Sequence, residues 1–385
     1  MRSPALSIIF WARRNLFATP KDIALTALLV LLSFWAISHV IYWAVFVARW
    51  DVVSDSLRVF LVGTLPSTEF WRAWVALLLV ASIVGSVSGL GFAIRPRHMV
   101  FGFLLLVFLT VTFVGNNLVA LAALSGVMAS FAVSWVLVSR LAPSTAYVGL
   151  FVTGSLALIV TILAPAGMDR WGGLLLSLIF TLVSSFFILV FGVILAFGRR
   201  SSNLALRLFC IMYIESMRSL PLILIVYWIW IAGPLFLPTW NVATVTRGIA
   251  GFVVYFSAVA AESVRGGLQG LPKGQLEAAR SLGLGEFDIN YHVLLPQALR
   301  ASLPALMGNI LDVFNFVPVV FVVGLADFLR TGEMVLASPS YSNRTYEVYA
   351  FMLATYFVIG SVLTIVARGL EHHLAKGSRR LSELD

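Results

Sequence analysis

The chain has 385 residues, of which 60% are hydrophobic and only 11% are charged. A soluble domain carries about a quarter charged residues, so this composition excludes a soluble globular protein, and it equally excludes a disordered or collagen-like one. The net charge of +9 comes from basic residues in short clusters between apolar runs, a distribution typical of membrane topology rather than of nucleic-acid binding. The single cysteine, Cys210, allows neither an internal disulfide nor a cysteine metal motif.

Long apolar runs predict an all-α polytopic membrane protein with about ten transmembrane helices. The chain opens with a basic segment, residues 1–22, which lacks the apolar core of a secretory signal. Within it, residues 7–17 alternate apolar and basic side chains, which favours a short helix on the membrane surface. The expected spans are 23–48, 73–94, 99–115, 117–138, 146–165, 172–197, 207–231, 246–264, 303–325 and 347–367.

The basic residues predict how these spans are oriented. With the N-terminus in the cytosol, 18 of the 26 Lys and Arg residues lie on the cytosolic side and 7 on the outer side. Loops rich in Lys and Arg remain in the cytosol, so both termini are expected there. In this arrangement residues 265–302 form the longest cytosolic segment, and a segment of this length in a membrane protein usually has a function.

This cytosolic segment predicts two helices joined by a turn, which we call the elbow. Residues 275–282 are good helix formers, and Gly283 follows at the position where a C-terminal cap needs a positive φ. A second helix is expected to begin at Glu286 and to end near Pro296. The elbow is therefore expected to project from the membrane.

The elbow carries a motif of Glu-Ala-Ala, three residues, Gly, nine residues, and then an aliphatic residue followed by x-Leu-Pro. In this chain the motif residues are Glu277, Ala278, Ala279, Gly283, Val293, Leu295 and Pro296. The pattern resembles the coupling loop of importer-type ABC transporter permeases, with valine where that family has isoleucine. The resemblance implies that Glu277 pairs with an ATPase and that Gly283 and Pro296 aim the elbow. The alternative for Glu277 is a solvated acid in the first turn of a helix, where the helix dipole favours it.

Further segments extend the resemblance to the polar amino-acid uptake branch of that family, the histidine/glutamine type, over about residues 170–370. These segments are 171–176, 215–222, 261–269 and 295–300. The N-terminal half is similar to that of the long general L-amino-acid permeases. We therefore expect an accessory transmembrane region of about five helices (1–165), a type I importer permease core of about five helices (166–370), and a cytosolic tail (371–385).

The resemblance also implies a division of labour between subunits. No Gly-x4-Gly-Lys-Ser/Thr phosphate loop occurs in the chain, so ATP and Mg²⁺ are expected on a separate ATPase. This subunit is expected to be a non-catalytic permease that binds no cofactor, located in a bacterial inner membrane. Its expected partners are a cytosolic ABC ATPase dimer, a second paralogous permease, a periplasmic substrate-binding protein, an amino-acid substrate and membrane lipid, with no nucleic acid.

Two Glu-x-x-Arg sequences, Glu215–Arg218 and Glu262–Arg265, lie near the inner ends of their spans. Opposite charges three residues apart share a helix face, so each pair is expected to neutralise itself and to reach toward the membrane surface. A role in gating is the alternative. Pro221 is expected to kink its helix.

The expected span 303–325 carries an acidic residue, Asp312, near its middle, where an ionised group costs at least about 2.5 kcal/mol. At 100° per residue a polar stripe covers about a third of the helix circumference. Its members are Gly308, Asn309, Asp312 and Asn315. The stripe must face protein or water: Asp312 either lines the pathway and attracts an ammonium group, or makes a buried contact with the partner permease. Where many family members have Lys-Asp-Thr-Ser, this chain has the residues 315–318, Asn-Phe-Val-Pro, so the partner permease remains a possible holder of the substrate.

Two other classes of protein remain as alternatives to an importer permease. An ion-driven secondary amino-acid transporter would also need an intramembrane acid, but it usually has repeated halves, and residues 1–165 and 170–370 do not match each other. A membrane scaffold would move no substrate. Uptake into vesicles separates these classes, because an importer needs ATP and its ATPase whereas a carrier needs an ion gradient.

Overall fold

The structure, a computed structural model, describes residues 15–91, 118–141, 144–236 and 242–382, and they divide into two units at Asp51 and Val52. In the first unit, α2 (Pro20–Tyr42) begins at a capping box formed by Thr19 and Asp22 and continues into a π-helical turn, η1 (Trp43–Val47). The helix is apolar on all sides and buries no residue, which suits a span surrounded by lipid. It matches the expected span 23–48.

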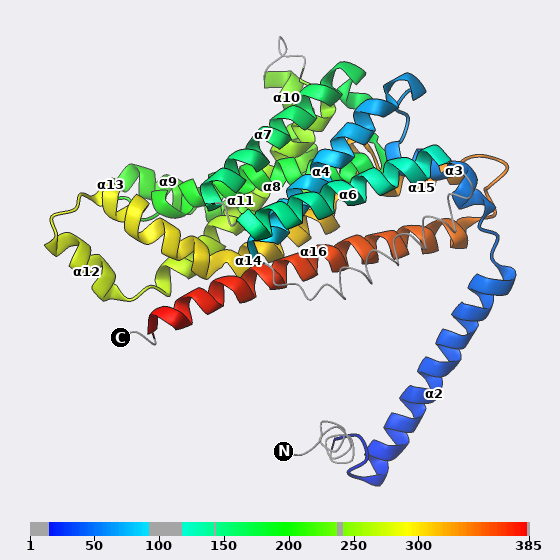
Figure 1. Ribbon diagram of the computed structural model, residues 1–385, viewed down its shortest axis with the longest axis horizontal. Helices are drawn as coiled ribbons and strands as arrows, with labels where there is room; N and C mark the ends of the chain where they lie inside the picture. Colours follow the sequence, from blue (N-terminus) through cyan, green and yellow to red (C-terminus); the bar gives the residue numbers. More distant parts are fainter. Residues whose placement is uncertain (1–14, 92–117, 142–143, 237–241, 383–385) are drawn as a thin grey trace. The chain divides into compact units, whose positions relative to one another are not determined.

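The second unit is a bundle of helices (Figure 1). Its α-helices are α3 (Asp51–Val62), α4 (Phe70–Gly91), α6 (Leu118–Leu141), α7 (Thr145–Leu163), α8 (Gly173–Gly198), α9 (Leu204–Ser219), α10 (Leu222–Phe236), α11 (Thr244–Gln269), α12 (Lys273–Ser281), α13 (Glu286–Asp288), α14 (Leu295–Phe316), α15 (Phe328–Leu336) and α16 (Thr345–Ser382). The described part of the chain contains seven helices long and apolar enough to cross a membrane, or eight if one bent pair is a single span. The predicted all-α membrane fold is confirmed.

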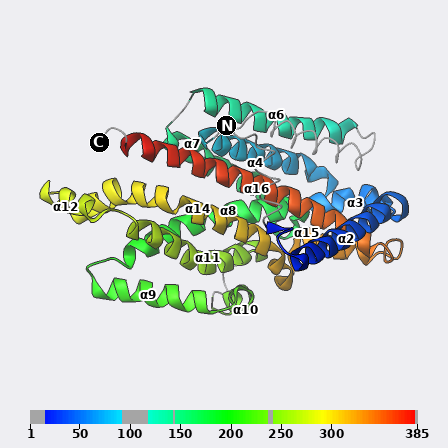
Figure 2. The same ribbon diagram turned by 90° about the horizontal axis from the view of Figure 1, so that it is seen from below.

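The centre of the bundle is formed by α8, α11, α14 and α16. Figure 2 shows α14 running between α11 and α16, and α8 contacts both α11 and α14. A second group, α4, α6 and α7, joins this centre through α4. Gly85 and Gly89 allow α4 and α6 to touch, since a Cβ at Gly85 would lie 2.5 Å from the carbonyl oxygen of Phe131.

The expected spans agree with the helices except at a few places. The span 99–115 and most of the surface helix 7–17 lie outside the described residues. Two short helices were not expected: α3, and α15, which follows a 3₁₀ segment η6 (Val317–Val323) and the two-residue strand β1 (Ala326–Asp327). The helix α16 continues to Ser382, through most of the segment expected to be a tail.

The expected span over 207–231 is not one continuous helix, because α9 and α10 meet at an angle of 109°. Leu220 has extended backbone angles (φ −97°, ψ 146°), as the residue before a proline prefers, and Pro221 has no N–H for the helical ladder. The expected kink at Pro221 is therefore a complete break between two helices.

The second arm of the elbow was also expected to end near Pro296, and this was wrong. The π-helix η5 (Ile289–Leu294) continues directly into α14, so one helical segment runs from Glu286 to Val323. Pro296 lies in the first turn of α14, where the change from π to α hydrogen bonding accommodates its missing N–H. The second arm of the elbow and the helix that carries Asp312 are therefore parts of one helical segment.

Residues just after the unit boundary pack into the bundle core. Phe60 of α3 is fully buried, with its ring centroid 5.2 Å from that of Phe351 and 6.2 Å from that of Phe328. Gly63, at φ 63°, lies so close to Gly172 that a Cβ on it would lie 2.6 Å from the Cα of Gly172. The domain boundary at 165, drawn from the family resemblance, remains a prediction, and α3 belongs to the same compact unit as the core.

A buried carboxyl group at the start of α15 provides a pH test of the fold. Asp327 is fully buried and accepts hydrogen bonds from the backbone N–H groups of Leu329 and Arg330, both at 3.1 Å. Burial raises the pKa of the Asp327 carboxyl from 3.8 to about 7, although these two hydrogen bonds oppose the rise. The folded protein thus binds this proton more tightly than the unfolded chain does.

The free energy of unfolding is therefore expected to fall as the pH rises from about 4 to about 7 and then to level off. At most about 4 kcal/mol depends on this carboxyl, because a tenfold change in proton affinity corresponds to about 1.4 kcal/mol. Asp327→Asn keeps an oxygen acceptor for the helix cap and removes the titration. Thermal unfolding of the purified protein at pH 5 and pH 8 should show a smaller pH effect in this variant, and equal pH effects in both proteins would contradict the assignment.

Candidate functional site

The elbow follows α11 and is shaped by a glycine cap. The N–H of Gly283 donates to the carbonyl of Arg280 at 2.9 Å, and the N–H of Leu284 donates to that of Ala279 at 3.3 Å. This pair of bonds is a Schellman motif, in which the residue after the helix cap adopts a left-handed conformation. Gly283 has φ 77°, as expected from its position in the sequence. The cap turns the chain from α12 into the second arm.

The motif residues divide between an exposed and a buried face. Glu277 and Ala278 are exposed, whereas Ala279 is buried in the same core cluster as Ile289 and Leu294 of η5. Ala279 therefore joins the two arms of the elbow, and Ala278 is the exposed one of the two alanines. Leu295 is half-buried and Pro296 is exposed. Within the described part of the chain, the carboxylate of Glu277 has no hydrogen bond or ion pair.

The tip of the elbow carries exposed apolar side chains that the sequence analysis did not identify. Leu282 is 79% exposed and Phe287 is 75% exposed, and the ring of Phe287 stacks on that of Tyr291 at a centroid distance of 5.8 Å. Arg280 and Glu286 form an ion pair of 2.9 Å across the turn. Exposed apolar groups on a polar elbow are typical of a protein-binding surface.

The predicted charge pairs form only in part. Glu262 accepts two hydrogen bonds from Arg265, at 2.8 and 2.6 Å, as expected for one of the two pairs. Arg218 lies 3.7 Å from Glu262 instead of pairing with Glu215. Arg199, at the C-terminal end of α8, contacts Glu262 at 2.5 Å and Glu215 at 3.3 Å. We call these five residues the Glu262 cluster.

Arg199 was missed by the sequence analysis because its partners lie 16 and 63 positions away. Its only signal was a basic residue directly after the end of an apolar span. The side chain of Glu262 is 14% exposed, so its charge is largely removed from solvent and depends on the surrounding arginines. The cluster therefore connects α8, α9 and α11 at the end of the bundle from which the elbow projects.

The polar stripe of α14 also divides. Asn309 is buried and donates a hydrogen bond to the hydroxyl of Ser263 on α11 at 3.2 Å. Gly308, Asp312 and Asn315 are exposed on the surface of the chain, and a Cβ at Gly308 would contact nothing within 4 Å. Asn309 thus connects two helices of the chain, while the other three residues face whatever surrounds it.

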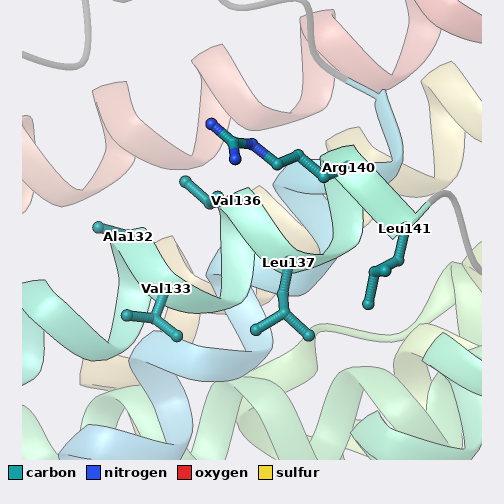
Figure 3. Close-up of a pocket in the computed structure, with 6 residues that line it drawn as sticks. All are labelled: Ala132, Val133, Val136, Leu137, Arg140 and Leu141. Carbon is teal, nitrogen blue, oxygen red and sulfur yellow. The ribbon is translucent and has the colours of Figure 1, made fainter.

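Two hollows on the surface of the described residues differ in chemistry. A hollow of about 430 Å³ is lined by residues of α6 alone, and Figure 3 shows their side chains projecting from this one helix. A second hollow, of about 610 Å³, is lined by residues of α10, η6 and α15, among them Tyr227, Phe321 and Arg330. Among the described residues, no group of three His, Cys, Asp or Glu side chains is arranged to hold a metal ion.

The bundle of long apolar helices, with the elbow projecting from it, defines a polytopic membrane protein. Residues 159–379 match the model of a family described as the binding-protein-dependent transport system inner membrane component. The chain belongs to this family. It is therefore a transport subunit that works with a substrate-binding protein and, as ABC importer permeases do, with an ATPase.

Similarity to individual relatives extends over almost the whole chain. The inner membrane amino-acid ABC transporter permease protein YhdY of Escherichia coli (strain K12) is 28% identical over 383 residues, covering 95% of this chain and 93% of that protein. The glutamate/glutamine/aspartate/asparagine transport system permease protein BztC of Rhodobacter capsulatus is also 28% identical, covering 96% and 94%. A solved structure described as an amino acid ABC transporter with histidines is 30% identical over 52% of this chain and 91% of that one, with a TM-score of 0.46.

Proposed function

We propose that this protein is a transmembrane permease subunit of an ATP-driven importer for amino acids. The observation that carries the proposal is the elbow, where Glu277, Ala278 and the capped turn at Gly283 form an exposed surface beside the membrane-spanning bundle. Relatives matched along more than nine-tenths of their length carry names that specify amino-acid transport. The family membership supplies the class of transport, and these names supply the substrate class.

The elbow docks on a cytosolic ABC ATPase. Glu277 is free to pair with a basic residue of that partner, and the apolar tip at Leu282 and Phe287 adds contact area. ATP and Mg²⁺ bind to the ATPase, and this chain is a non-catalytic subunit that binds no cofactor. ATP-driven closure of the ATPase pair moves the elbow, and α14 moves with it because the second arm continues into that helix.

The translocation pathway is formed with a second, paralogous permease, and a periplasmic binding protein delivers the amino acid. The exposed stripe of Gly308, Asp312 and Asn315 faces this pathway, because exposed polar groups at such a depth need water or protein beside them. Residues 1–165 form an accessory region outside the pathway. The protein lies in a bacterial inner membrane with both termini in the cytosol.

Reconstitution tests this function directly. Vesicles that contain the permease pair, the ATPase and the binding protein are loaded with ATP at the face that carries the ATPase. Uptake of a radiolabelled amino-acid mixture is then measured with and without ATP, and with an imposed proton or sodium gradient. We expect uptake only with ATP. Uptake driven by the gradient alone would instead assign an ion-driven carrier, a class that would also use the intramembrane acid Asp312.

A further inference from the structure

The Glu262 cluster joins three helices through a single carboxylate. One carboxylate oxygen of Glu262 accepts a hydrogen bond from Arg199, which follows α8, and the other accepts one from Arg265 of the same helix. Arg218 of α9 lies 3.7 Å from this second oxygen. Arg199 uses its second terminal nitrogen to reach Glu215 of α9 at 3.3 Å. A guanidinium presents several donors in a fixed planar fork, which lets Arg199 join two carboxylates, whereas a lysine offers a single point charge.

Apart from the cluster, the contacts of α9 with the bundle lie on one face, where Tyr213, Ile214 and Met217 pack against the core and the Tyr213 hydroxyl lies 3.2 Å from that of Ser257. Only Cys210 and Ile214 of its sixteen residues are buried, and the hydroxyl of Tyr213 donates to the carbonyl of Val254 at 2.7 Å. Both ends of α9 are interrupted: Asn203 begins the helix as its cap, and the break at Pro221 ends it with a turn of 109°. A helix bounded by two interruptions can pivot as one body, and its position then depends on the contacts along its side.

The cluster also lies close to the elbow along one rigid element. Glu262 is seven residues before Gln269, the last residue of α11, which corresponds to about 10 Å along the helix axis. The elbow begins four residues later, at Lys273. A displacement of the elbow therefore reaches Glu262 through the short loop before Lys273 and then through less than two turns of α11, which is unbroken there.

We propose that Arg199 and Glu262 are positioning residues for transport, which hold α9 on α8 and α11 so that movement of the elbow is passed on to α9. This inference rests on the proposed function for its source of movement. The two ionic contacts of α9 itself are made by Glu215 and Arg218, whose side chains are 56% and 42% exposed. Removing these two contacts should release α9 without leaving a buried charge unpaired.

The test variant is Glu215→Gln/Arg218→Gln, which removes one acid and one base and keeps the net charge. Glu262 retains Arg199 and Arg265, so the variant is expected to fold and to reach wild-type levels in the membrane. Spin labels at the exposed positions Met212 of α9 and Gln269 of α11, in a Cys210→Ala background, report the distance between the two helices. We expect one narrow distance distribution in the parent protein and a broader one in the double variant.

Transport measurements decide whether this attachment serves coupling. In the reconstituted importer, the double variant should import about three- to tenfold fewer amino acids per ATP hydrolysed, because each exposed ion pair contributes only a modest free energy. Arg200→Gln is the matched control: Arg200 is the neighbour of Arg199, lies outside the cluster, and forms no ion pair within the described residues. This variant should keep both the distance distribution and the import ratio.

The two measurements separate the inference from the function on which it rests. An unchanged distance distribution in the double variant would show that the cluster does not hold α9. If the distance distribution of the double variant broadens but its import per ATP equals that of Arg200→Gln, α9 does not transmit the movement. Either result overturns the inference while ATP-dependent uptake by the parent importer stands. Absence of ATP-dependent uptake in the parent would instead overturn the proposed function, and the distance measurement does not depend on it.

Discussion

Gly283→Val is expected to cause a roughly tenfold loss of ATP hydrolysis, measured as the rate that the loaded binding protein stimulates. The permease should still be present in the membrane. Gly283 has φ 77°, a conformation that costs an ordinary residue about 1–2 kcal/mol and a β-branched one more. A Cβ at this position would contact nothing within 4 Å, so the substitution acts on the backbone conformation and not through a clash. Since about 1.4 kcal/mol corresponds to a factor of ten, the correctly aimed elbow becomes a minor state.

The matched control is Gly283→Asn, because asparagine tolerates the left-handed conformation far better than valine. This variant should retain most of the stimulated hydrolysis. Glu277→Ala should also lower it, to a smaller degree, because exposed ion pairs are individually weak. ATPase activity and membrane levels are measured together. Equal stimulation of the wild type and Gly283→Val would contradict the assignment of the elbow as the ATPase-docking segment.

Asp312→Asn is expected to change the substrate preference by about tenfold or more in favour of acidic over neutral amino acids, and by as much against basic ones. The side chain of Asp312 is exposed on α14, so in the membrane it must be covered by water or by protein. A unit charge about 10 Å from the substrate, at an effective dielectric constant near 20, changes its free energy by about 1.7 kcal/mol. Asparagine keeps the size of the side chain and removes this charge, while ATP remains the energy source.

Competition uptake assays with acidic, neutral and basic amino acids measure this ranking. Asn309→Ala serves as the control on the same helix, because Asn309 is buried against Ser263 and faces the chain itself. It should lower the stability of the assembly and leave the ranking as it is in the wild type. If Asp312→Asn also leaves the ranking unchanged, Asp312 is a contact with the partner permease and that subunit supplies the selectivity.

The amino-acid sequence by itself determined the features that depend on local chemistry. Runs of about twenty apolar residues require helices in a membrane, because no other structure satisfies the backbone of a single segment there. The first helix of the elbow and its turn at Gly283 were also predictable, because they depend on the φ preferences of single residues. The disruption of the helix at Pro221 was predictable on the same ground. The sequence could not specify how far the helix would turn at Pro221, since a missing N–H removes a constraint without choosing a direction.

The tertiary structure decided which polar side chains meet. Sequence spacing paired Glu215 with Arg218 on one helix face, but both were redirected to Arg199 and Glu262 when α8, α9 and α11 packed together. The tertiary structure likewise buried Phe60 of the unexpected helix α3 against α15 and α16, two helices that lie far from Phe60 in the sequence. A short-range ion pair stabilises a helix by only a few tenths of a kcal/mol. A largely buried carboxylate such as Glu262 must be neutralised by the cations that the packing of other helices brings to it, and the spacing of residues within one helix does not specify them.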